Sequence, residues 1–460
     1  MLQTTSMHPT AASAAHRLRS TMSGSVLVPT DAPYESARQL WNGAVDRRPA
    51  LIARCRNATD VQAAVVAARE HNLTLSVRGG GHDWEGRSLR DGGLVVDLTA
   101  MRRVTVDVET RTAVVEGGAT AGDLVAAARS SGLAPVTGTV KAVGMAGLTL
   151  AGGYGPLNGK YGLALDNLLG AEVVLANGLR IRADANENGD LYWALRGGGG
   201  NFGVVTSLRY RLHPIGSVLC GLMLFPASEA LRVLRGYQEL IAAAPDELTI
   251  MTGFLPGPDR QPMLFVFPTW SGDRAGGDAV VSKLNELGTP LSIKIGPMAY
   301  EDVLSMFEAQ VVNGRHHELQ TRWVAELTED TAALLLEGAR AITSSFSAIA
   351  VHHFHGAATR VPVTETAFGL RRHHLLVEII AAWEHSSADD GTIHRQWARA
   401  LCQSMAPLAL PGGYPNLLGA TEHERVRLAY GPNFARLMEL KRRFDPENVF
   451  ASATPTLLGR

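Results

Sequence analysis

The chain has 460 residues, of which 46% are hydrophobic and 19% are charged, and its formal net charge at pH 7 is −1. This length is too great for one ordinary hydrophobic core, so we expect two domains. The near-zero charge, without a basic patch, argues against nucleic acid and against an anionic membrane as partners. No window of the sequence has the length and apolar character of a membrane-spanning helix.

The cysteines and the N-terminal segment bear on the compartment. Cys55, Cys220 and Cys402 are far apart and odd in number. This pattern is typical of a reducing compartment and offers no C-x-x-C metal or redox pair. Residues 1–24 are rich in Ser, Thr and Ala and lack the apolar centre of a signal peptide. We therefore expect a frayed N-terminal tail and a cytoplasmic protein.

The first half of the chain predicts a mixture of helices and short strands. We expect helices at residues 58–71, where residues 58–60 form the cap, and at 121–130, begun by Thr120. The expected strands are residues 73–77, 93–98, 104–108, 113–116, 171–176, 179–182 and 204–212. Asn177-Gly178 between two apolar runs predicts a hairpin with a type I′ turn. Asp190 is expected to cap a short helix.

Beyond His213-Pro214, which we take as a boundary, the pattern predicts a second unit. The expected strands are residues 248–255, 263–270, 348–354 and 375–383, and the expected helices are 278–287, 299–306, 328–344 and 393–406. Strands joined by helices in this way indicate an antiparallel sheet backed by helices, in a chain of the α+β class. Two more helices are expected after Thr421.

The most informative stretch is Arg78-Gly-Gly-Gly-His-Asp-Trp-Glu-Gly86, which follows an apolar strand. Its three consecutive glycines leave a turn bare, so that backbone N–H groups can reach an anion such as phosphate. A single imidazole, His82, comes directly after the turn. The arrangement suggests a nucleotide cofactor, although a plain glycine turn with a surface histidine fits the stretch alone equally well.

Arg78-Gly-Gly-Gly-His82 resembles the R-x-G-G-H motif of the vanillyl-alcohol oxidase superfamily, in its berberine bridge enzyme-like branch of FAD-linked oxidases. These proteins carry an FAD-binding domain of the p-cresol methylhydroxylase type. Three further stretches agree in sequence and order, namely residues 144–155, 192–203 and 443–450. The four stretches span nearly the whole chain, whereas the match between residues 214 and 411 is much weaker.

A second glycine pattern, Gly198-x-Gly200-x-x-Gly203, fits the dinucleotide fingerprint G-x-G-x-x-G. It follows an expected helix and precedes an expected strand, which is the reverse of a Rossmann unit, so we reject NAD. In the family that the chain resembles, this loop packs beside the flavin.

The resemblance implies an FAD-binding domain of two α+β subdomains, formed by residues 1–213 and completed by 421–460, and a substrate-binding domain at 214–420. It also implies a covalent bond between His82 and the 8α-methyl of FAD. The candidate cofactor-binding residues are Arg78, Gly79, Gly80, Gly81, His82, Asp83, Gly144, Gly147, Leu148, Gly152, Gly153, Gly155, Asp166, Asn167, Gly203, Val204 and Asn416.

Two departures from the family pattern concern the flavin and the catalytic base. Some relatives attach the flavin a second time through a cysteine, and Val140 stands where we place that cysteine, which implies a single tether. Relatives often have Tyr-x-Asn-Tyr, whose second tyrosine takes a proton from the substrate. Here the match is Tyr414-Pro-Asn416-Leu417, and leucine cannot take a proton. Tyr414 and Asn416 remain candidate site residues, although a packed aromatic role fits Tyr414 equally well.

Glu378 is our candidate for the base, because it interrupts the apolar run Leu376 to Trp383. A carboxylate in such a strand is costly unless it is paired or functional, and a structural ion pair fits equally well. In relatives, a Gln or Glu on this strand faces the flavin. A histidine from the clusters at 316–317, 352–355 and 373–374 is another candidate base. His353 and His355 would share a strand face, but no carboxylate or cysteine partner is evident, so we expect no metal.

The sequence therefore predicts an FAD-dependent oxidoreductase that transfers hydride from a small organic molecule, of the secondary-metabolite or alcohol type, to covalently bound flavin. Dioxygen is the expected oxidant of the reduced flavin. The alternative is a flavin-containing protein that sequesters a small molecule, as in drug resistance, with little turnover. The vacant tyrosine position slightly favours this alternative. Substrate, physiological oxidant and oligomeric state stay open.

Overall fold

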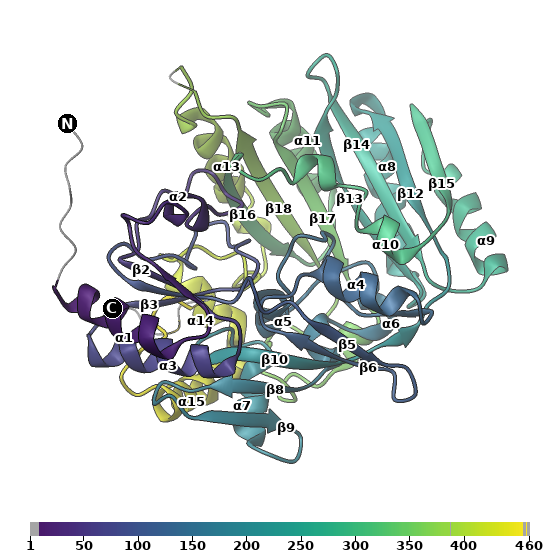
Figure 1. Cartoon of the computed structure of the whole chain (residues 1–460). Coiled ribbons are helices and arrows are strands. Elements are labelled where there is room, and N and C mark those ends of the chain that lie inside the picture. Colours follow the sequence, from purple (N-terminus) through teal and green to yellow (C-terminus); the bar gives the residue numbers. More distant parts are fainter. Residues whose placement is uncertain (1–8, 387, 454–456, 458–460) are drawn as a thin grey trace.

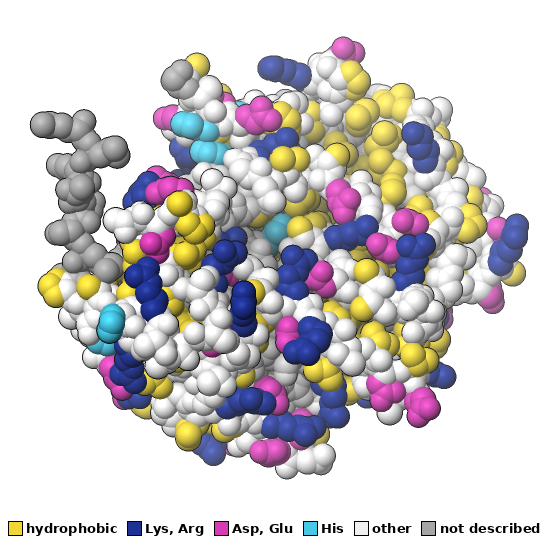
Figure 2. Space-filling view, viewed as in Figure 1, with side chains coloured by type: hydrophobic (Ala, Val, Ile, Leu, Met, Phe, Trp, Pro, Cys, Tyr) yellow, Lys and Arg dark blue, Asp and Glu magenta, His cyan; other side chains and the backbone are white. Residues whose placement is uncertain are grey.

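A computed structural model of the chain describes residues 9–386, 388–453 and 457. The fold is α+β, as expected, and Figure 1 shows smaller sheets on one side of the molecule and a large sheet on the other. Figure 2 shows acidic and basic side chains interspersed over the same face, in keeping with the near-zero net charge. Among the described helices, none combines the length and the apolar character that crossing a membrane requires.

The first small sheet contains parallel strands and carries the glycine turn at one strand end. Its order is β1-β2-β4-β3, with β2 and β3 parallel to β4 and β1 antiparallel to β2. The bounds are β1 (Ser25–Leu27), β2 (Leu51–Arg54), β3 (Leu75–Arg78) and β4 (Leu94–Asp97), with α2 (Tyr34–Ala37) and α3 (Ala58–Glu70). The glycine turn begins directly after β3.

The expectation of a frayed N-terminal tail is wrong for residues 9–24. Helix α1 (Pro9–Thr21) packs on α3 and buries Ala11, Ala14, Ala15 and Leu18. The Asp60 carboxylate accepts hydrogen bonds from the N–H groups of Ser23 and Gly24 at 2.8 and 3.0 Å. The cap of α3 is Asn57, one residue before the predicted cap. Residues 1–8 lie outside the described part of the chain.

The second small sheet is antiparallel, in the order β5-β6-β10-β8-β9. The bounds of its elements are β5 (Val104–Asp107), β6 (Thr112–Glu116), β8 (Leu168–Val174), β9 (Arg180–Asp184) and β10 (Val204–Arg211), with α4 (Ala121–Arg129) and α7 (Gly189–Leu195). Thr120 begins α4 with a capping box, as the sequence predicts. Short elements between these are β7 (Leu133–Ala134), α5 (Met145–Ala151), α6 (Asn158–Tyr161) and β11 (His213–Pro214).

Two local predictions in this region are wrong. The β8–β9 hairpin forms, but its turn is not type I′, because of its two central residues only Gly178 has positive φ (+82°). Gly178 N–H donates to the Leu175 carbonyl, and Asn177 instead accepts from Leu179 N–H through its side chain. Asp190 does not cap α7, since its carboxylate oxygens bind two arginines of the C-terminal tail, Arg436 and Arg443.

The large sheet is antiparallel throughout, in the order β15-β12-β14-β13-β17-β18-β16. Its bounds are β12 (Val218–Pro226), β13 (Leu248–Pro256), β14 (Pro262–Trp270), β15 (Ser292–Met298), β16 (His316–Val324), β17 (Ala348–Phe354) and β18 (His374–Trp383). The sequence predicted β13, β14, β17 and β18 and missed β12, β15 and β16.

Helices cover one face of the large sheet (Figure 1). They are α8 (Ala230–Ala242), which the sequence analysis missed, α9 (Arg274–Asn285), α11 (Glu329–Arg340) and α13 (Thr392–Ser404). The helix expected at 299–306 is the short α10 (Tyr300–Val303), and α12 (Ala357–Arg360) follows β17. The other face of the sheet packs on the smaller sheets, where Trp323, Phe354 and Leu376 share one core with Tyr154 and Tyr414.

The C-terminal helices α14 (His423–Tyr430) and α15 (Phe434–Phe444) return the chain to the smaller sheets. Lys441 of α15 and Asp445, which directly follows the helix, form a fully buried ion pair at 2.5 Å. Phe450 then enters the core of the first small sheet. Both ends of the described chain therefore contribute to the side of the molecule that holds the glycine turn.

Candidate active site

A cavity of about 320 Å³ lies between the glycine loops and the face of the large sheet that the helices do not cover. One wall consists of the glycine turn after β3, residues 138–139, 143–144 and 146–148, and Gly200 and Gly203. The opposite wall consists of side chains from β17, β18 and the segment after residue 413. The cavity thus brings together the four sequence stretches that carry the resemblance.

In the glycine wall, two backbone segments contact each other directly, because the glycines carry no side chains. A Cβ added at Gly80 would stand 2.5 Å from the backbone nitrogen of Gly144, so each of these two loops leaves room for the other. Gly81 has φ +69°, which disfavours any side chain. A Cβ at Gly147 would meet open space. The wall is therefore flat and bare, and it fits a planar ring with phosphates, as the predicted FAD requires.

His82 stands at the edge of this wall and lines the cavity. Burial lowers the pKa of its imidazole to about 4, so the ring is neutral at physiological pH. Its Nε2 atom finds no hydrogen-bond partner within the described residues. A neutral nitrogen with a free lone pair, facing a cofactor-sized space, is what attack on an electrophilic carbon requires.

The charged residues near His82 make different contacts. Arg78 turns toward the loop after α2, where it donates to the carbonyls of Ala37 and Gln39, and it is not among the residues that line the cavity. Asp83 lines the cavity and binds the buried Arg87 at 2.7 Å. Arg87 also donates to the Leu418 carbonyl, which ties this loop to the C-terminal wall.

Tyr414 and Asn416 form a hydrogen-bonded pair against the glycine wall. The Tyr414 hydroxyl accepts from Gly153 N–H at 2.8 Å and from the Asn416 amide at 3.1 Å. The same amide donates to the Leu148 carbonyl at 3.2 Å. Burial raises the pKa of Tyr414 to about 12, so the hydroxyl stays protonated. Leu417 lines the cavity with an aliphatic side chain, at the position where relatives have their second tyrosine.

The remaining candidates lie outside the main cavity wall and stay predictions. Asp166 binds Arg371 through both carboxylate oxygens, at 2.8 and 2.9 Å, and Asn167 binds His213. Val204 is buried in the core of the first small sheet. A Cβ at Gly152 would meet the ring of Tyr414 at 2.5 Å, so this glycine makes room for the tyrosine.

Glu378 faces the cavity from β18 and has a partner on the adjacent strand β17. Its Oε2 lies 3.4 Å from Nε2 of His352, and both side chains line the cavity. The two residues are diagonal neighbours, because Ala350 is opposite Glu378 and His352 is opposite Leu376. The sequence left open whether Glu378 is paired or functional; the structure places its carboxylate on the cavity wall, close to Nε2 of His352 but without a hydrogen bond to it.

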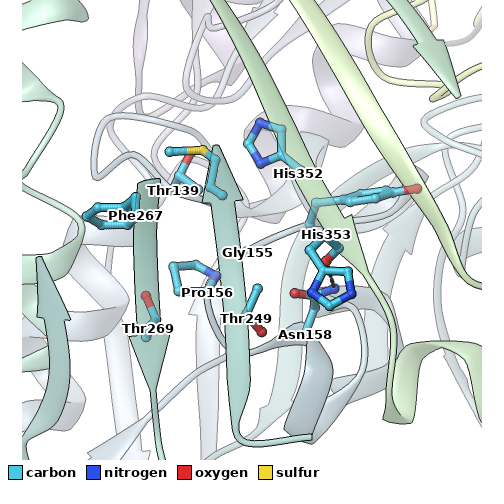
Figure 3. Close-up of a pocket in the computed structure, with 11 residues that line it drawn as sticks. Thr139, Gly155, Pro156, Asn158, Thr249, Phe267, Thr269, His352 and His353 are labelled. Atoms are coloured by element: carbon cyan, nitrogen blue, oxygen red, sulfur yellow. Dashed lines mark hydrogen bonds between the residues drawn. The ribbon is translucent and has the colours of Figure 1, made fainter. Parts of the chain in front are cut away.

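A small annex of about 20 Å³, whose lining residues Figure 3 shows, lies beside the main cavity. The pairing of β13 with β17 ends at Thr252 and Val351, and His352 and Tyr154 line both spaces. An annex of this volume holds one water molecule. In the part of the chain that the structure describes, no group of three His, Cys, Asp or Glu side chains could hold a metal ion.

Sequence reasoning missed Tyr154 and His352 as cavity residues. Tyr154 lies within the glycine stretch 144–155, and its hydroxyl is 2.6 Å from Nε2 of His374. Nδ1 of His374 lies 2.8 Å from the Arg372 carbonyl, which can only accept, so Nδ1 carries the proton and Tyr154 donates to Nε2. The aromatic residue inside a glycine loop was the available signal for Tyr154, whereas His352 was one histidine among several. The expected cysteine position, Val140, is not among the lining residues, although Thr139 and Val143 are.

Comparison with known proteins agrees with this site. A family model described as FAD binding domain matches residues 49–184, and one described as berberine and berberine like matches residues 413–455. The (R)-6-hydroxynicotine oxidase of Paenarthrobacter nicotinovorans is 32% identical over 443 residues, which cover 93% of this chain and 95% of the relative. An FAD-linked oxidoreductase of Aspergillus terreus is 31% identical over 468 residues, covering 94% of both chains.

Solved structures show the same fold. The crystal structure of 6-hydroxy-D-nicotine oxidase from Arthrobacter nicotinovorans superposes with a TM-score of 0.84 at 30% identity, covering 95% of this chain and 98% of that one. A berberine bridge enzyme-like protein of Physcomitrella patens gives a TM-score of 0.88 at 22% identity, over 97% and 100% of the two chains. These similarities confirm the resemblance and the fold class predicted from the sequence. The chain therefore belongs to the berberine bridge enzyme-like family of FAD-linked oxidoreductases.

Proposed function

We propose that the protein oxidises a small organic molecule, of the secondary-metabolite or alcohol type, with FAD that is covalently bound to His82 and reoxidised by dioxygen. When bound, the flavin accepts a hydride from the substrate. The observation that carries the proposal is the neutral, unpartnered Nε2 of His82 on the wall of a cavity whose glycines leave room for a flavin.

The two walls divide the work in this proposal. The backbone of residues 79–81 and 144–147 would hold the phosphates and the ring, and Leu148 and Asn416 would close the ring site from the side. Glu378 would take the proton that the substrate loses, with the imidazole of His352 3.4 Å away on the same wall. The neutral hydroxyls of Tyr154 and Tyr414 would orient the substrate by hydrogen bonding.

Acid precipitation tests the covalent bond. The parent chain should carry its yellow colour into the pellet, whereas His82→Ala should bind FAD through the glycine backbone but release it to the supernatant. The flavin potential of this variant should fall, because the electron-withdrawing 8α substituent is gone. His394→Ala is the control, since His394 is a buried histidine that lies outside the cavity lining. Colour that leaves the unmutated chain would overturn the assignment.

The alternative, a flavin-containing protein that sequesters a small molecule, rests on the aliphatic Leu417 at the family's tyrosine position. Anaerobic mixing with (R)-6-hydroxynicotine, the compound in the name of the relative that is 32% identical, is the first probe of turnover. A panel of small alcohols extends it. Bleaching of the flavin absorbance indicates an enzyme, while a spectral shift without bleaching by any ligand that binds indicates a sequestering protein.

A further inference from the structure

Three aromatic rings form a continuous stack at the edge of the glycine wall. The imidazole of His82 stacks on the indole of Trp41, with 4.2 Å between ring centroids and 15° between planes. The same indole also stacks on the imidazole of His317, at 4.0 Å and 21°. Trp41 comes from the loop after α2, and His317 comes from β16 of the large sheet. The ring of His82 therefore has one face covered and an edge on the cavity.

The stack is an apolar contact between neutral rings. Burial lowers the pKa of His317 to about 3 and that of His82 to about 4, so neither ring is charged at physiological pH. Neither ring nitrogen of His317 has a hydrogen-bond partner among the residues that the structure describes. His317 thus serves Trp41 as a flat surface, because it is not engaged in hydrogen bonding elsewhere.

Asn42 fixes the indole between the two parts of the molecule. Its side-chain amide donates to the carbonyls of Trp84 and His317, and its Oδ1 accepts from His317 N–H at 2.8 Å. The Trp41 carbonyl also accepts from Gly314 N–H at 2.9 Å. Asn42 is 2% exposed, so these bonds are shielded from water. Asn42 thus joins Trp84, which follows the glycine turn, to His317 of β16, which lies 275 residues from Asn42 in the sequence.

We propose that Trp41 is a positioning residue that orients the imidazole of His82 for its bond to FAD, and that His317 supports it from the large sheet. The inference rests on the proposed covalent link and adds a requirement to it: the flavin becomes attached when the large sheet has docked. In the net reaction, the imidazole loses its N–H hydrogen and the 8α-methyl loses one hydrogen as the N–C bond forms. These two hydrogens amount to two protons and two electrons, which dioxygen takes up to become hydrogen peroxide.

A fixed ring orientation matters because the attacking lone pair must point at one carbon. Bond formation between held groups is fast when the reacting atoms are close and aligned, and a misplacement of about 1 Å can cost about a hundredfold. Without the indole, the imidazole of His82 can rotate about its side-chain bonds. The bond should then form slowly, although the phosphate contacts, which come from backbone, are unchanged.

The experiment separates binding from bond formation. Each variant is produced with limiting riboflavin and incubated with excess FAD, and two quantities are followed: quenching of FAD fluorescence and flavin that stays with the acid-precipitated chain. We expect Trp41→Leu to slow attachment at least tenfold while FAD binding stays within about threefold of the parent. Trp41→Phe, which keeps a ring, should attach flavin at nearly the parent rate.

Trp270→Leu is the matched control, since Trp270 is as buried as Trp41, at 9% exposed, but belongs to the helix-covered core of the large sheet. Attachment at the parent rate in Trp41→Leu, or equal slowing in Trp270→Leu, would overturn the proposal. If Trp41→Leu fails to fold, His317→Leu decides: it should slow attachment measurably, and the parent rate would count against the stack. A parent chain without acid-stable flavin would overturn the covalent link itself, which distinguishes that failure from this one.

Discussion

The two walls of the cavity are built in opposite ways. The cofactor wall is backbone, and its glycines at positions 80 and 144 approach so closely that a Cβ on either would stand 2.5 Å from a nitrogen of the other. The substrate wall is made of side chains that stand on the strands of the large sheet, chiefly Glu378 and His352, with Leu417 beside them. Added atoms would disrupt the close backbone packing of the first wall, whereas removal of functional groups would take away the chemistry of the second.

This difference explains where a family can vary. A site made of backbone tolerates little change, because any added side chain would occupy the space of the cofactor or of a neighbouring loop. A side-chain site on a rigid sheet can change its chemistry without moving the sheet. Substrate choice is therefore expected to depend on β17, β18 and residues 414–417, and the cofactor on the glycine loops.

Removing a functional group from the substrate wall should give the largest effect. Glu378→Gln keeps the shape of the side chain but cannot accept a proton, and a positioned base contributes on the order of a hundredfold or more. Stopped-flow flavin reduction should slow by that factor, with little change in ligand affinity. Glu318→Gln, on the neighbouring strand β16, changes a carboxylate that does not line the cavity and serves as control. An unchanged reduction rate in Glu378→Gln would remove Glu378 from the mechanism.

Adding one carbon to the cofactor wall should give the next largest effect. In Gly80→Ala, the new Cβ would stand 2.5 Å from the nitrogen and 2.7 Å from the Cα of Gly144, and backbone cannot rotate away. Overpacking of this kind costs about 1–3 kcal/mol, or about five- to over a hundredfold in affinity if the cost falls on binding. FAD titration of the variant measures it. Gly216→Ala, where a Cβ meets open space, should bind FAD like the parent, and equal loss in both would indicate a general folding defect.

The cofactor wall could be predicted almost completely from the sequence, because glycine motifs act locally. His82, Asp83 and the glycines at 79–81, 144 and 147, which the sequence marks as candidates, all line the cavity, and their contact with FAD stays a prediction. Four strands of the large sheet were also predictable from their apolar runs. Strand β16, with the sequence HHELQTRWV, and the edge strand β15, which contains Lys294, Gly296 and Pro297, lack such runs.

What could not be predicted depends on contacts between distant segments. The pairing of Glu378 with His352 follows from the register between β17 and β18, which no local pattern encodes. The stack of Trp41 with His82 and His317 forms only when a loop, a turn and a strand from separate parts of the sequence pack together. Arg78 matches the family motif but binds the carbonyls of a loop instead of lining the cavity. The sequence motif therefore includes Arg78, but its hydrogen bonds in the structure go to the loop after α2.

The substrate side of the molecule should also respond to acid. Burial lowers the pKa of His317 and of His374 to about 3, whereas an unfolded histidine titrates near 6.5. Between these values the unfolded chain binds the proton, so stability falls as pH falls, by about 1.4 kcal/mol per pH unit for each such histidine. Urea unfolding between pH 6 and pH 4 should show a shallower pH slope in His317→Phe than in the parent. Equal slopes would mean that the His317 ring is not held neutral in the folded state.

The smallest expected effect concerns the second flavin link that some relatives have. The sequence placed the missing cysteine at Val140, but the residues of this loop that line the cavity are Gly138, Thr139 and Val143. The Val140 carbonyl accepts from Val143 N–H in a tight turn, at 3.4 Å, and of these two residues only Val143 lines the cavity. We therefore expect Val140→Cys to leave one attachment, at His82, and Val143→Cys to be the variant in which a thiol reaches the flavin. Peptide mass mapping of both variants measures this, and flavin on the position-140 peptide would show that the loop rearranges when the cofactor binds.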